Sequence, residues 1–240
     1  MLKTNQKNEL YQYSTMAALV GGVFGGTITF EELLKHGDHG IGTLDNFDGE
    51  LIIINGEAYQ VRQDGKAYKK SPHETTPYAS ISYFQPDFSF KIEGGATQKE
   101  IEEIISSKSV GPNVFYAVKI QGTFKYVDTR VVPKQKRPYP LLVEAVKNQP
   151  TYHFDYISGT MVGFWTPPFI QGIGVTGYHI HFLDKDEQVG GHVYGYEMIE
   201  GIIEVAQQKN LDLVMPNSEE YYHTDLCNPD MVEHIELAER

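Results

Sequence analysis

The sequence predicts a mixed α+β fold, in which mixed or antiparallel β-sheets are accompanied by a few packed helices. Three observations support this class. Strand-like segments outnumber helical ones, several of them adjoin as hairpins, and helical periodicity is confined to a few short stretches. The 240 residues, 40% of them hydrophobic, are enough to bury a substantial core. We expect a single domain over residues 1–240 with two β-rich subdomains, and the Pro-rich stretch 133–150 is the only candidate for a boundary between them.

The N-terminal part of the chain carries no charge between residues 10 and 30. Its best apolar run, Met16–Val20, is too short to cross a bilayer, so we read 14–24 as a partly buried helix that breaks at glycines. A hairpin follows. The strand-like segments 51–54 and 57–61 flank an Asn-Gly pair, which favours a two-residue hairpin turn.

Runs rich in β-branched and aromatic residues predict the remaining strands, at 79–84, 114–121, 123–132, 159–166, 201–206 and 211–215. Three helices are predicted after the first. A capping box at 97–100 begins one of them, in which isoleucines recur at helical spacing. A second spans 141–147 and ends before Pro150. The last takes its N-cap and first residue from 228–229 and runs to about Glu239.

Three histidines form the most informative pattern in the chain. His179 and His181 lie two residues apart in a run of Tyr, Ile, Phe and Leu, so on a strand their side chains share a face. The polar segment that follows predicts a turn centred near Asp186 and Glu187, which places His192 opposite His181. Three imidazoles would then converge on one side of a two-stranded ribbon.

Such a trio favours a catalytic metal site. Structural zinc usually has four protein ligands with cysteines among them, and Cys227 is the only cysteine in the chain. Three histidines instead leave a coordination position open, which is how catalytic Zn²⁺ is held. The alternative is that the histidines are ordinary strand and turn residues. Buried imidazoles need partners, however, and a facing trio favours the metal.

Two other candidate residues are less specific on their own. Glu50, which precedes the first hairpin, is either a proton donor or a turn residue. Arg130 lies in a run rich in valine, where it either holds a substrate carboxylate through its planar fork or takes part in a surface ion pair.

Charge and cysteine content limit the partners. The formal net charge of −12 argues against a phosphate backbone or an anionic membrane surface as the partner. The basic stretch 134–137 precedes prolines and is read as a solvated loop. A lone cysteine allows no internal disulfide and fits a reducing compartment. We therefore expect a cytoplasmic protein that binds neither nucleic acid nor membrane.

Several longer motifs occur in one order along the chain. They are YSTM at 13–16, GIGTLDNFDGEL at 40–51, FYAVKIQG at 115–122, VEAVKNQP at 143–150, GTMVGF at 159–164, GYHIHF at 177–182 and GGH at 190–192. Together they resemble bacterial α-acetolactate decarboxylases over nearly the whole length. The resemblance implies decarboxylation of (S)-2-acetolactate to (R)-acetoin, a homodimer, and a zinc ion whose ligands match His179, His181 and His192.

The same resemblance implies roles for residues outside the trio. The family's motif glutamate matches Glu50, its strand arginine matches Arg130, and Thr43 of the same motif is implied in substrate binding. A further glutamate near the C-terminus matches Glu239, with Glu236 as the alternative. Decarboxylation leaves negative charge, which Arg130 would hold, and the new C–H bond needs a proton, for which Glu50 and the C-terminal glutamate are rival donors.

Two other functions fit the residues. An HxH pair with an acidic residue and a later histidine also resembles the iron or manganese site of cupin dioxygenases. Here Asp186 and Glu187 lie just off the cupin spacing, and no second cupin motif follows. The other alternative is a non-enzymatic module that binds a ligand or DNA, on fold analogy alone. The acidic net charge weighs against DNA.

Overall fold

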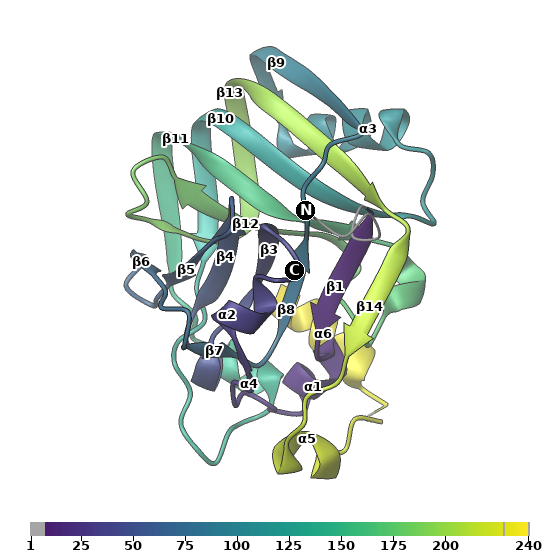
Figure 1. The fold of residues 1–240 in the computed structure, drawn as a ribbon. Helices are drawn as coiled ribbons and strands as arrows, with labels where there is room; N and C mark the ends of the chain where they lie inside the picture. Colours follow the sequence, from purple (N-terminus) through teal and green to yellow (C-terminus); the bar gives the residue numbers. More distant parts are fainter. Residues whose placement is uncertain (1–7, 228, 240) are drawn as a thin grey trace.

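Two large β-sheets organise the chain in the structure, a computed structural model that describes residues 8–227 and 229–239 (Figure 1). The first sheet has seven strands in the spatial order β14 (Asn210–Val214), β1 (Glu9–Tyr13), β8 (Ala79–Ser82), β3 (His39–Thr43), β4 (Glu50–Ile54), β5 (Glu57–Val61) and β6 (Ala67–Lys69). The second has five strands in the order β10 (Phe115–Arg130), β11 (Thr151–Thr166), β12 (Gly177–Asp184), β13 (Gly190–Gln208) and β9 (Phe88–Thr97).

The pairing within these sheets is almost entirely antiparallel. Within the described residues, β1 and β14 are the only two named strands that pair in parallel. Strand β10 pairs with β13 as well as with β11, so four strands of the second sheet form a closed ring of pairings. The predicted class, α+β with mixed and antiparallel sheets, is confirmed.

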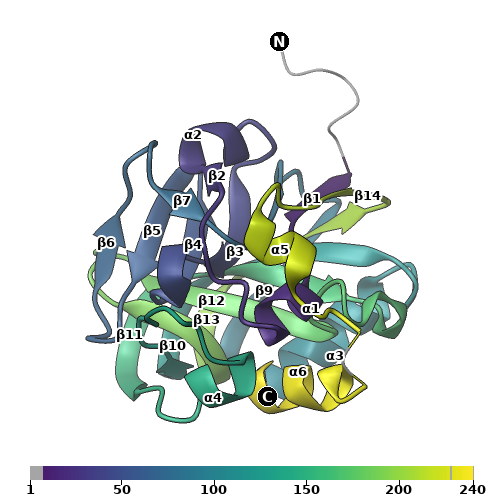
Figure 2. The same cartoon turned by 90° about the horizontal axis from the view of Figure 1, so that it is seen from below.

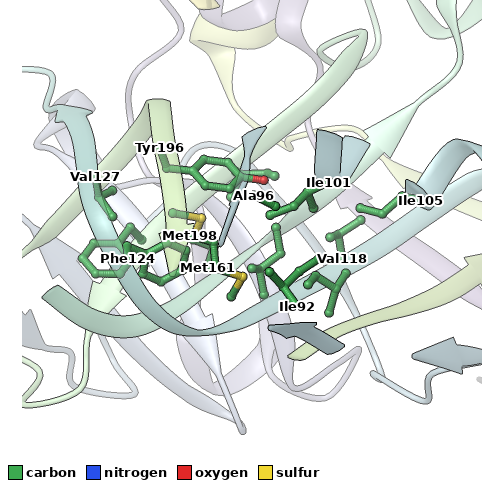
Figure 3. Packing of buried hydrophobic residues seen from close by; sticks show 14 of the residues in the cluster. Ile92, Ala96, Ile101, Ile105, Val118, Phe124, Val127, Met161, Tyr196 and Met198 are labelled. Atoms are coloured by element: carbon green, nitrogen blue, oxygen red, sulfur yellow. The ribbon is translucent and has the colours of Figure 1, made fainter. Parts of the chain in front are cut away.

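Helix α3 (Gln98–Lys108) covers the outer face of the five-stranded sheet (Figure 1). Its buried residues, Ile101 and Ile105, pack on strand residues such as Val118, Met161 and Met198 (Figure 3). The predicted capping box is present, because Thr97 accepts from the backbone of Glu100 and the Glu100 side chain accepts from the backbone of Thr97. Helix α3 thus covers one face of the five-stranded sheet, and the other face contacts the rest of the molecule.

That opposite face packs against the seven-stranded sheet. Apolar side chains from both sheets form one buried cluster, with Ile52 and Val61 on one side and Ala117, Val162 and Phe164 on the other. Because β12 lies in this contact beside β4, the histidine strand of one sheet meets the glutamate strand of the other.

The remaining elements are short. They are α1 (Met16–Val20), α2 (Phe30–Leu33), α4 (Leu142–Ala145), α5 (Glu219–His223), α6 (Met231–Glu239), the 3₁₀ turns Asp45–Phe47 and Pro168–Ile170, and the ribbon of β2 (Ile28–Thr29) with β7 (Thr75–Thr76). Figure 2 shows α1, α4 and α6 gathered on one side of the sheets. Each of these three helices contributes buried residues to one shared apolar cluster, among them Met16, Leu142 and Ala238.

Several predicted elements are confirmed with changed boundaries. The Asn-Gly hairpin is β4–β5, with Asn55 at φ 53° and Gly56 at φ 77°, the positive values that its turn requires. The helix predicted at 14–24 is only Met16–Val20, because the chain turns at Gly21 and Gly22. The N-cap predicted at residue 228 lies outside the described residues.

The prediction of two strands at 114–121 and 123–132 is wrong, since β10 runs without a break through Gly122. This glycine lies opposite Gly159 and Gly201 in the neighbouring strands, and an added Cβ would lie 2.1 Å from the carbonyl oxygen of Glu200. Gly122 therefore marks a close approach of three backbones and not a turn. The strands predicted at 159–166 and 201–206 are likewise parts of the longer β11 and β13.

No helix in the described part of the chain is long and apolar enough to span a bilayer. The proposed boundary at 133–150 corresponds to the connection between β10 and β11, which contains α4. The division into subdomains there stays a prediction.

Candidate metal centre

The three histidines lie on two adjacent antiparallel strands, as predicted. His179 and His181 belong to β12, and His192 of β13 lies directly opposite His181. The turn between them contains Glu187 at φ 57° and is held by the Asp184 carboxylate, which accepts from the backbone N–H groups of residues 188 and 189. The hairpin thus fixes the spacing of the imidazoles.

The imidazoles converge on one point. One ring nitrogen from each histidine lies within 4.8 Å of the other two, and the Nε2 atoms of His179 and His181 are 3.2 Å apart. Bonds of 2.0–2.1 Å to a tetrahedral zinc ion would separate two nitrogens by roughly 3.3–3.4 Å. The His179–His181 pair is close to that separation, and the His192 nitrogen lies within 4.8 Å of both.

Hydrogen bonds indicate which nitrogens of His181 and His192 carry no proton. The Nδ1 atom of His181 lies 2.8 Å from the carbonyl oxygen of Leu51, which can only accept, so Nδ1 carries the proton and Nε2 presents a lone pair. On His192, Nε2 lies 3.3 Å from Nη2 of Arg130, and a guanidinium only donates. Both Nε2 atoms therefore lack a proton, as metal binding requires, but the lone pair of His192 accepts from Arg130, and a metal ion would have to displace that hydrogen bond.

Burial keeps the imidazoles of His179 and His181 neutral. His181 is fully buried, and burial lowers its pKa well below the usual value, with smaller contributions in the same direction from interaction with His179 and with the Arg130 cation. Burial and the nearby Arg130 lower the pKa of His179 to about 3. Since a metal must compete with a proton for the same lone pair, these shifts favour metal binding at neutral pH.

Glu50 and Thr43 reach the histidines from the other sheet. Thr43 of β3 lies directly opposite Glu50 of β4. The Oε1 atom of Glu50 accepts from the backbone N–H of Val132 at 2.9 Å, while Oε2 lies 3.6 Å from Nε2 of His181. The hydroxyl of Thr43 donates to the carbonyl of Gly49 at 2.8 Å. A carboxyl group is thus held beside the metal position and only 8% exposed.

Arg130 ends β10 next to His192, its register partner on β13. Its guanidinium is 9% exposed and donates through Nη2 to the carbonyl oxygen of Ala238 at 2.8 Å. A buried cation is therefore anchored between the metal position and the C-terminal helix.

These groups line a small cavity of about 40 Å³. Its polar wall contains the predicted residues Thr43, Glu50, Arg130, His179 and His192. Its apolar wall comes from residues that sequence patterns did not identify, namely Met16, Leu19, Phe47, Tyr78, Val132, Leu142 and Val146. Larger cavities, of about 490 and 520 Å³, lie beside the β12–β13 turn and beside α3. Neither contains any of the three histidines, so chemistry and not size identifies the site.

The C-terminal glutamates differ in what the structure describes. Glu239 is the last residue of α6, and the preceding Ala238 contacts Arg130 and lines the cavity, but the Glu239 side chain lies outside the described part of the chain. Glu236 is exposed on the same helix. The acidic residues of the cupin alternative, Asp186 and Glu187, are exposed in the turn.

The sequence analysis also does not identify Leu51 and Val132 as residues of the site. They act through a backbone carbonyl and a backbone N–H, which leave no signature in residue type. Only the register of β4 and the path of the chain after β10 reveal them.

An α+β scaffold that gathers three imidazoles, a buried carboxyl group and a buried guanidinium at one small cavity defines a candidate metalloenzyme. The family model for Alpha-acetolactate decarboxylase matches residues 10–228. The curated Alpha-acetolactate decarboxylase of Bacillus licheniformis is 42% identical over 232 residues, covering 97% of this chain and 92% of the relative. The one from Bacillus subtilis is 41% identical over 237 residues, covering 99% and 93%.

Solved structures agree with the sequence comparisons. The crystal structure of alpha-acetolactate decarboxylase from Bacillus subtilis strain 168 superposes with a TM-score of 0.94 at 42% identity, covering 96% of this chain and 99% of that one. A Staphylococcus aureus protein described as similar to Alpha-acetolactate Decarboxylase gives 0.93 at 36% identity, covering 97% and 100%. This chain belongs to the alpha-acetolactate decarboxylase family, a family of carboxy-lyases.

Proposed function

We propose that this protein catalyses the zinc-dependent decarboxylation of (S)-2-acetolactate to (R)-acetoin. The observation that carries the proposal is the convergence of His179, His181 and His192 beside Glu50 and Arg130, at the edge of one small cavity, in a chain of this family. The donor set suits zinc, because three neutral imidazoles leave room for exchangeable ligands.

The substrate determines what the site must do. 2-Acetolactate carries its carboxylate and a hydroxyl on the carbon next to a ketone. Breaking the bond to the carboxylate releases carbon dioxide and leaves an electron pair that delocalises onto the ketone oxygen. One proton must then be added to that carbon to give acetoin. A zinc ion on the three histidines would supply Lewis acidity toward the hydroxyl and ketone oxygens.

Arg130 would bind the substrate's negative charge. Its guanidinium is fixed by the Ala238 carbonyl and lies beside His192, so it points a second cation at the same small space. A buried guanidinium with a fixed orientation holds a carboxylate, or the charge left after its loss, more strongly than a solvated one. Thr43 would contribute to binding from the same wall of the cavity.

Glu50 would supply the proton that sets the configuration of the product. Its Oε1 atom is held by Val132, which directs the carboxyl group toward His181 and the cavity. A donor fixed on one side of the reacting carbon delivers the proton to one face only. Glu239 is the rival donor, because it follows Ala238 at the cavity wall.

Metal analysis combined with a carbon dioxide release assay on racemic acetolactate tests the function. We expect about one zinc per chain, loss of activity on exhaustive chelation and its return with Zn²⁺. His181→Ala should lose metal and activity together. His153→Ala, at an exposed position on the outer surface of the sheet, is the control and should keep both. Full activity after chelation, or a protein that holds only iron, contradicts the zinc proposal.

We also propose a cytoplasmic homodimer. The dimer is inferred from the family resemblance, and the exposed free thiol of Cys227 is compatible with a reducing compartment. Sedimentation equilibrium at several protein concentrations tests the dimer, and a single species of one chain mass contradicts it.

A further inference from the structure

A buried polar network lies behind Glu50, on the side away from the histidines. Its centre is Gln60 of β5, which is 1% exposed and lies opposite Leu51 in the β4–β5 pair. The Nε2 atom of Gln60 donates to the carbonyl oxygen of Asp48 at 2.5 Å. Its Oε1 atom accepts from Nζ of Lys70 at 2.8 Å and from Nε of Arg62 at 3.1 Å.

These partners fix the orientation of the Gln60 amide. Lysine and arginine only donate hydrogen bonds, so the atom that faces Lys70 and Arg62 has to be the oxygen. The NH₂ group must then face Asp48, where a carbonyl oxygen can only accept. A flipped amide would oppose donors to donors and an oxygen to an oxygen. The network therefore has one arrangement that satisfies every member.

The Asp48 carbonyl lies two residues before Glu50, and the segment between them is held at each step. Gly49 has φ 86°, and an added Cβ would lie 2.0 Å from the carbonyl oxygen of Val61, so the segment is pressed against β5. Thr43 donates to the Gly49 carbonyl, and Glu50 itself accepts from Val132. Gln60 is the member of this set that ties the segment to β5 through a side chain.

The buried lysine supports a positioning role for the network. The Lys70 side chain is 7% exposed and pairs with Glu74 at 2.5 Å. Removing an ammonium group from water is expensive, and such a pair contributes little net stability. The presence of Lys70 is better accounted for by the orientation that it gives to the Gln60 amide. A buried ammonium group can only donate, and its charge strengthens the hydrogen bond, so it strongly favours the amide orientation in which the oxygen faces it.

We propose that Gln60 is a positioning residue for Glu50, and that Lys70 and Arg62 set the orientation of its amide. Gln60 fixes the Asp48 carbonyl, the carbonyl fixes the turn at Gly49, and the turn fixes the Glu50 carboxyl group at the substrate. The inference rests on the proposed role of Glu50 as proton donor. A displaced Glu50 transfers its proton more slowly and leaves the reacting carbon open to protons from water.

Two substitutions at position 60 test the Asp48 hydrogen bond separately from the lysine contact. Gln60→Met keeps the side-chain length but loses both contacts. Gln60→Glu keeps the contact with Lys70 but turns an oxygen toward the Asp48 carbonyl. Because both remove the same donor, both should lower kcat by about tenfold, the effect of one lost hydrogen bond. The enantiomeric excess of the acetoin should fall, while KM and bound zinc stay within about twofold of the unsubstituted protein.

Lys70→Met is a third variant that leaves Gln60 in place. Arg62 still contacts Oε1, so the amide is less firmly oriented but its bond to Asp48 can form. We expect a smaller loss of kcat, of about threefold, with a smaller loss of enantiomeric excess. This variant also covers the case in which neither change at position 60 yields folded protein.

Gln208→Met is the matched control. Gln208 is also 1% exposed, but it ends β13 at the opposite end from His192, and among the described residues its amide has no hydrogen-bond partner. This substitution should leave kcat and enantiomeric excess unchanged.

The outcomes separate the inference from the function on which it rests. Unchanged kcat and enantiomeric excess in folded Gln60→Glu overturn the inference. So does a joint fall of kcat, zinc content and melting temperature in the variants, which indicates a structural role. If the unsubstituted protein releases no carbon dioxide, the proposed function itself fails. If Glu50→Gln is fully active, only the donor role of Glu50 fails, together with the inference.

Discussion

The side chains of Glu50 and His181 are each held through one polar atom by a hydrogen bond to the backbone. That bond sets the position of the second polar atom of each side chain. The Val132 N–H holds Oε1 of Glu50, and the Leu51 carbonyl holds Nδ1 of His181. In both cases the second polar atom, Oε2 or Nε2, is turned toward the cavity, and these two atoms are 3.6 Å apart. In the proposed function, the proton donor and the metal ligand are therefore two neighbouring atoms and not one shared atom.

Glu50→Gln separates these two functions. Glutamine keeps an oxygen that can accept from Val132, so the shape of the site and the zinc content should be retained. It cannot give up a proton, so turnover should fall by about 10²–10⁴-fold, the usual range for a general acid or base. Zinc content, turnover and the enantiomeric excess of acetoin are the measurements. A wild-type rate with a single enantiomer would make Glu50 structural, and loss of zinc would place it among the metal ligands.

Arg130→Lys tests the planar fork. Lysine keeps the positive charge but cannot donate to the Ala238 carbonyl and hold an anion in the same fixed geometry. We expect KM to rise and kcat to fall, each by about tenfold, because binding of the substrate and of the charge that develops during reaction both suffer. Steady-state kinetics with (S)-2-acetolactate provides the measurement. Unchanged kinetic constants would show that charge alone suffices.

At the scale of single residues, sequence could predict side chains but not their partners. The spacing of His179, His181 and His192 was enough to place them together, because a two-residue strand period and a short turn fix the geometry. Glu50 and Arg130 are candidates from the sequence itself, but only the family resemblance gives them definite roles, since isolated charged residues carry little local signal. The sequence carries no signal for a role of Gln60, because that role depends on which strand pairs with β4.

The β12–β13 hairpin carries all three histidines of the candidate metal centre. Its strands pair through only three residue pairs, from His181–His192 to Leu183–Gly190. The turn is supported from the other sheet, where the N–H of Ala67 donates to the Gln188 carbonyl at 2.8 Å. Gly190 allows the closest approach, because an added Cβ would lie 2.1 Å from the carbonyl oxygen of Phe182.

Gly190→Ala should therefore weaken metal binding without touching a ligand. The methyl group would push β13 away from β12 and displace His192, two residues farther along. Disturbing the surroundings of a metal site typically costs about 10–100-fold in affinity, and we expect a loss in that range. Competition with a zinc chelator gives the affinity. Gly195→Ala on the same strand is the control, since its Cβ would meet only the Asp128 side chain, at 3.2 Å. Equal affinities in the two variants would contradict the packing argument.

Element prediction succeeded where the local pattern was complete. The Asn-Gly hairpin and the capping box at 97–100 each contain all of their determinants within a few residues. Where the determinants are remote, the sequence predicts too short a strand for β11 and no strand at all for β9. The N-terminal half of β11 alternates polar and half-buried residues, and β9 contains Gly94 and Gly95 at positive φ, so neither resembles an apolar strand locally. Both are strands because β10 and β13 supply hydrogen-bonding edges.

The whole molecule depends on the contact between its two sheets, because the histidines and Glu50 come from opposite sides of it. His39 lies in this contact and is 3% exposed. It stacks on Phe84 at 4.5 Å between ring centroids, meets the edge of Phe164 at 5.7 Å, and places Nε2 3.4 Å from the carbonyl oxygen of Gly163. A titratable ring is thus enclosed where β3 meets β11.

Burial lowers the pKa of His39 from 6.5 to about 4, with a smaller contribution in the same direction from the charge of Lys119, while hydrogen bonds to the Gly163 and Val118 backbones oppose the shift. Between those two values the unfolded chain binds more protons than the folded one. The stability that neutral His39 provides is therefore fully present above about pH 6.5, and it is lost as the pH falls toward about 4.

Replacing His39 should remove this share of the acid sensitivity. Over the full window the loss is on the order of 3 kcal/mol, and at pH 5 it is about 2 kcal/mol. His39→Phe keeps an aromatic ring between Phe84 and Phe164 but cannot be protonated, so its drop in unfolding free energy from pH 7 to pH 5 should be smaller than the wild-type drop by about 2 kcal/mol. At pH 7 it should be less stable by about 1 kcal/mol, because the Gly163 carbonyl loses its partner.

Urea denaturation at both pH values gives the four free energies, and the double difference cancels contributions common to both proteins, including those of the metal-site histidines. His73→Phe, at a position whose side chain is 85% exposed, should retain the wild-type pH dependence. An equal drop in His39→Phe and the unsubstituted protein would mean that His39 is not what makes the packing of the two sheets sensitive to acid.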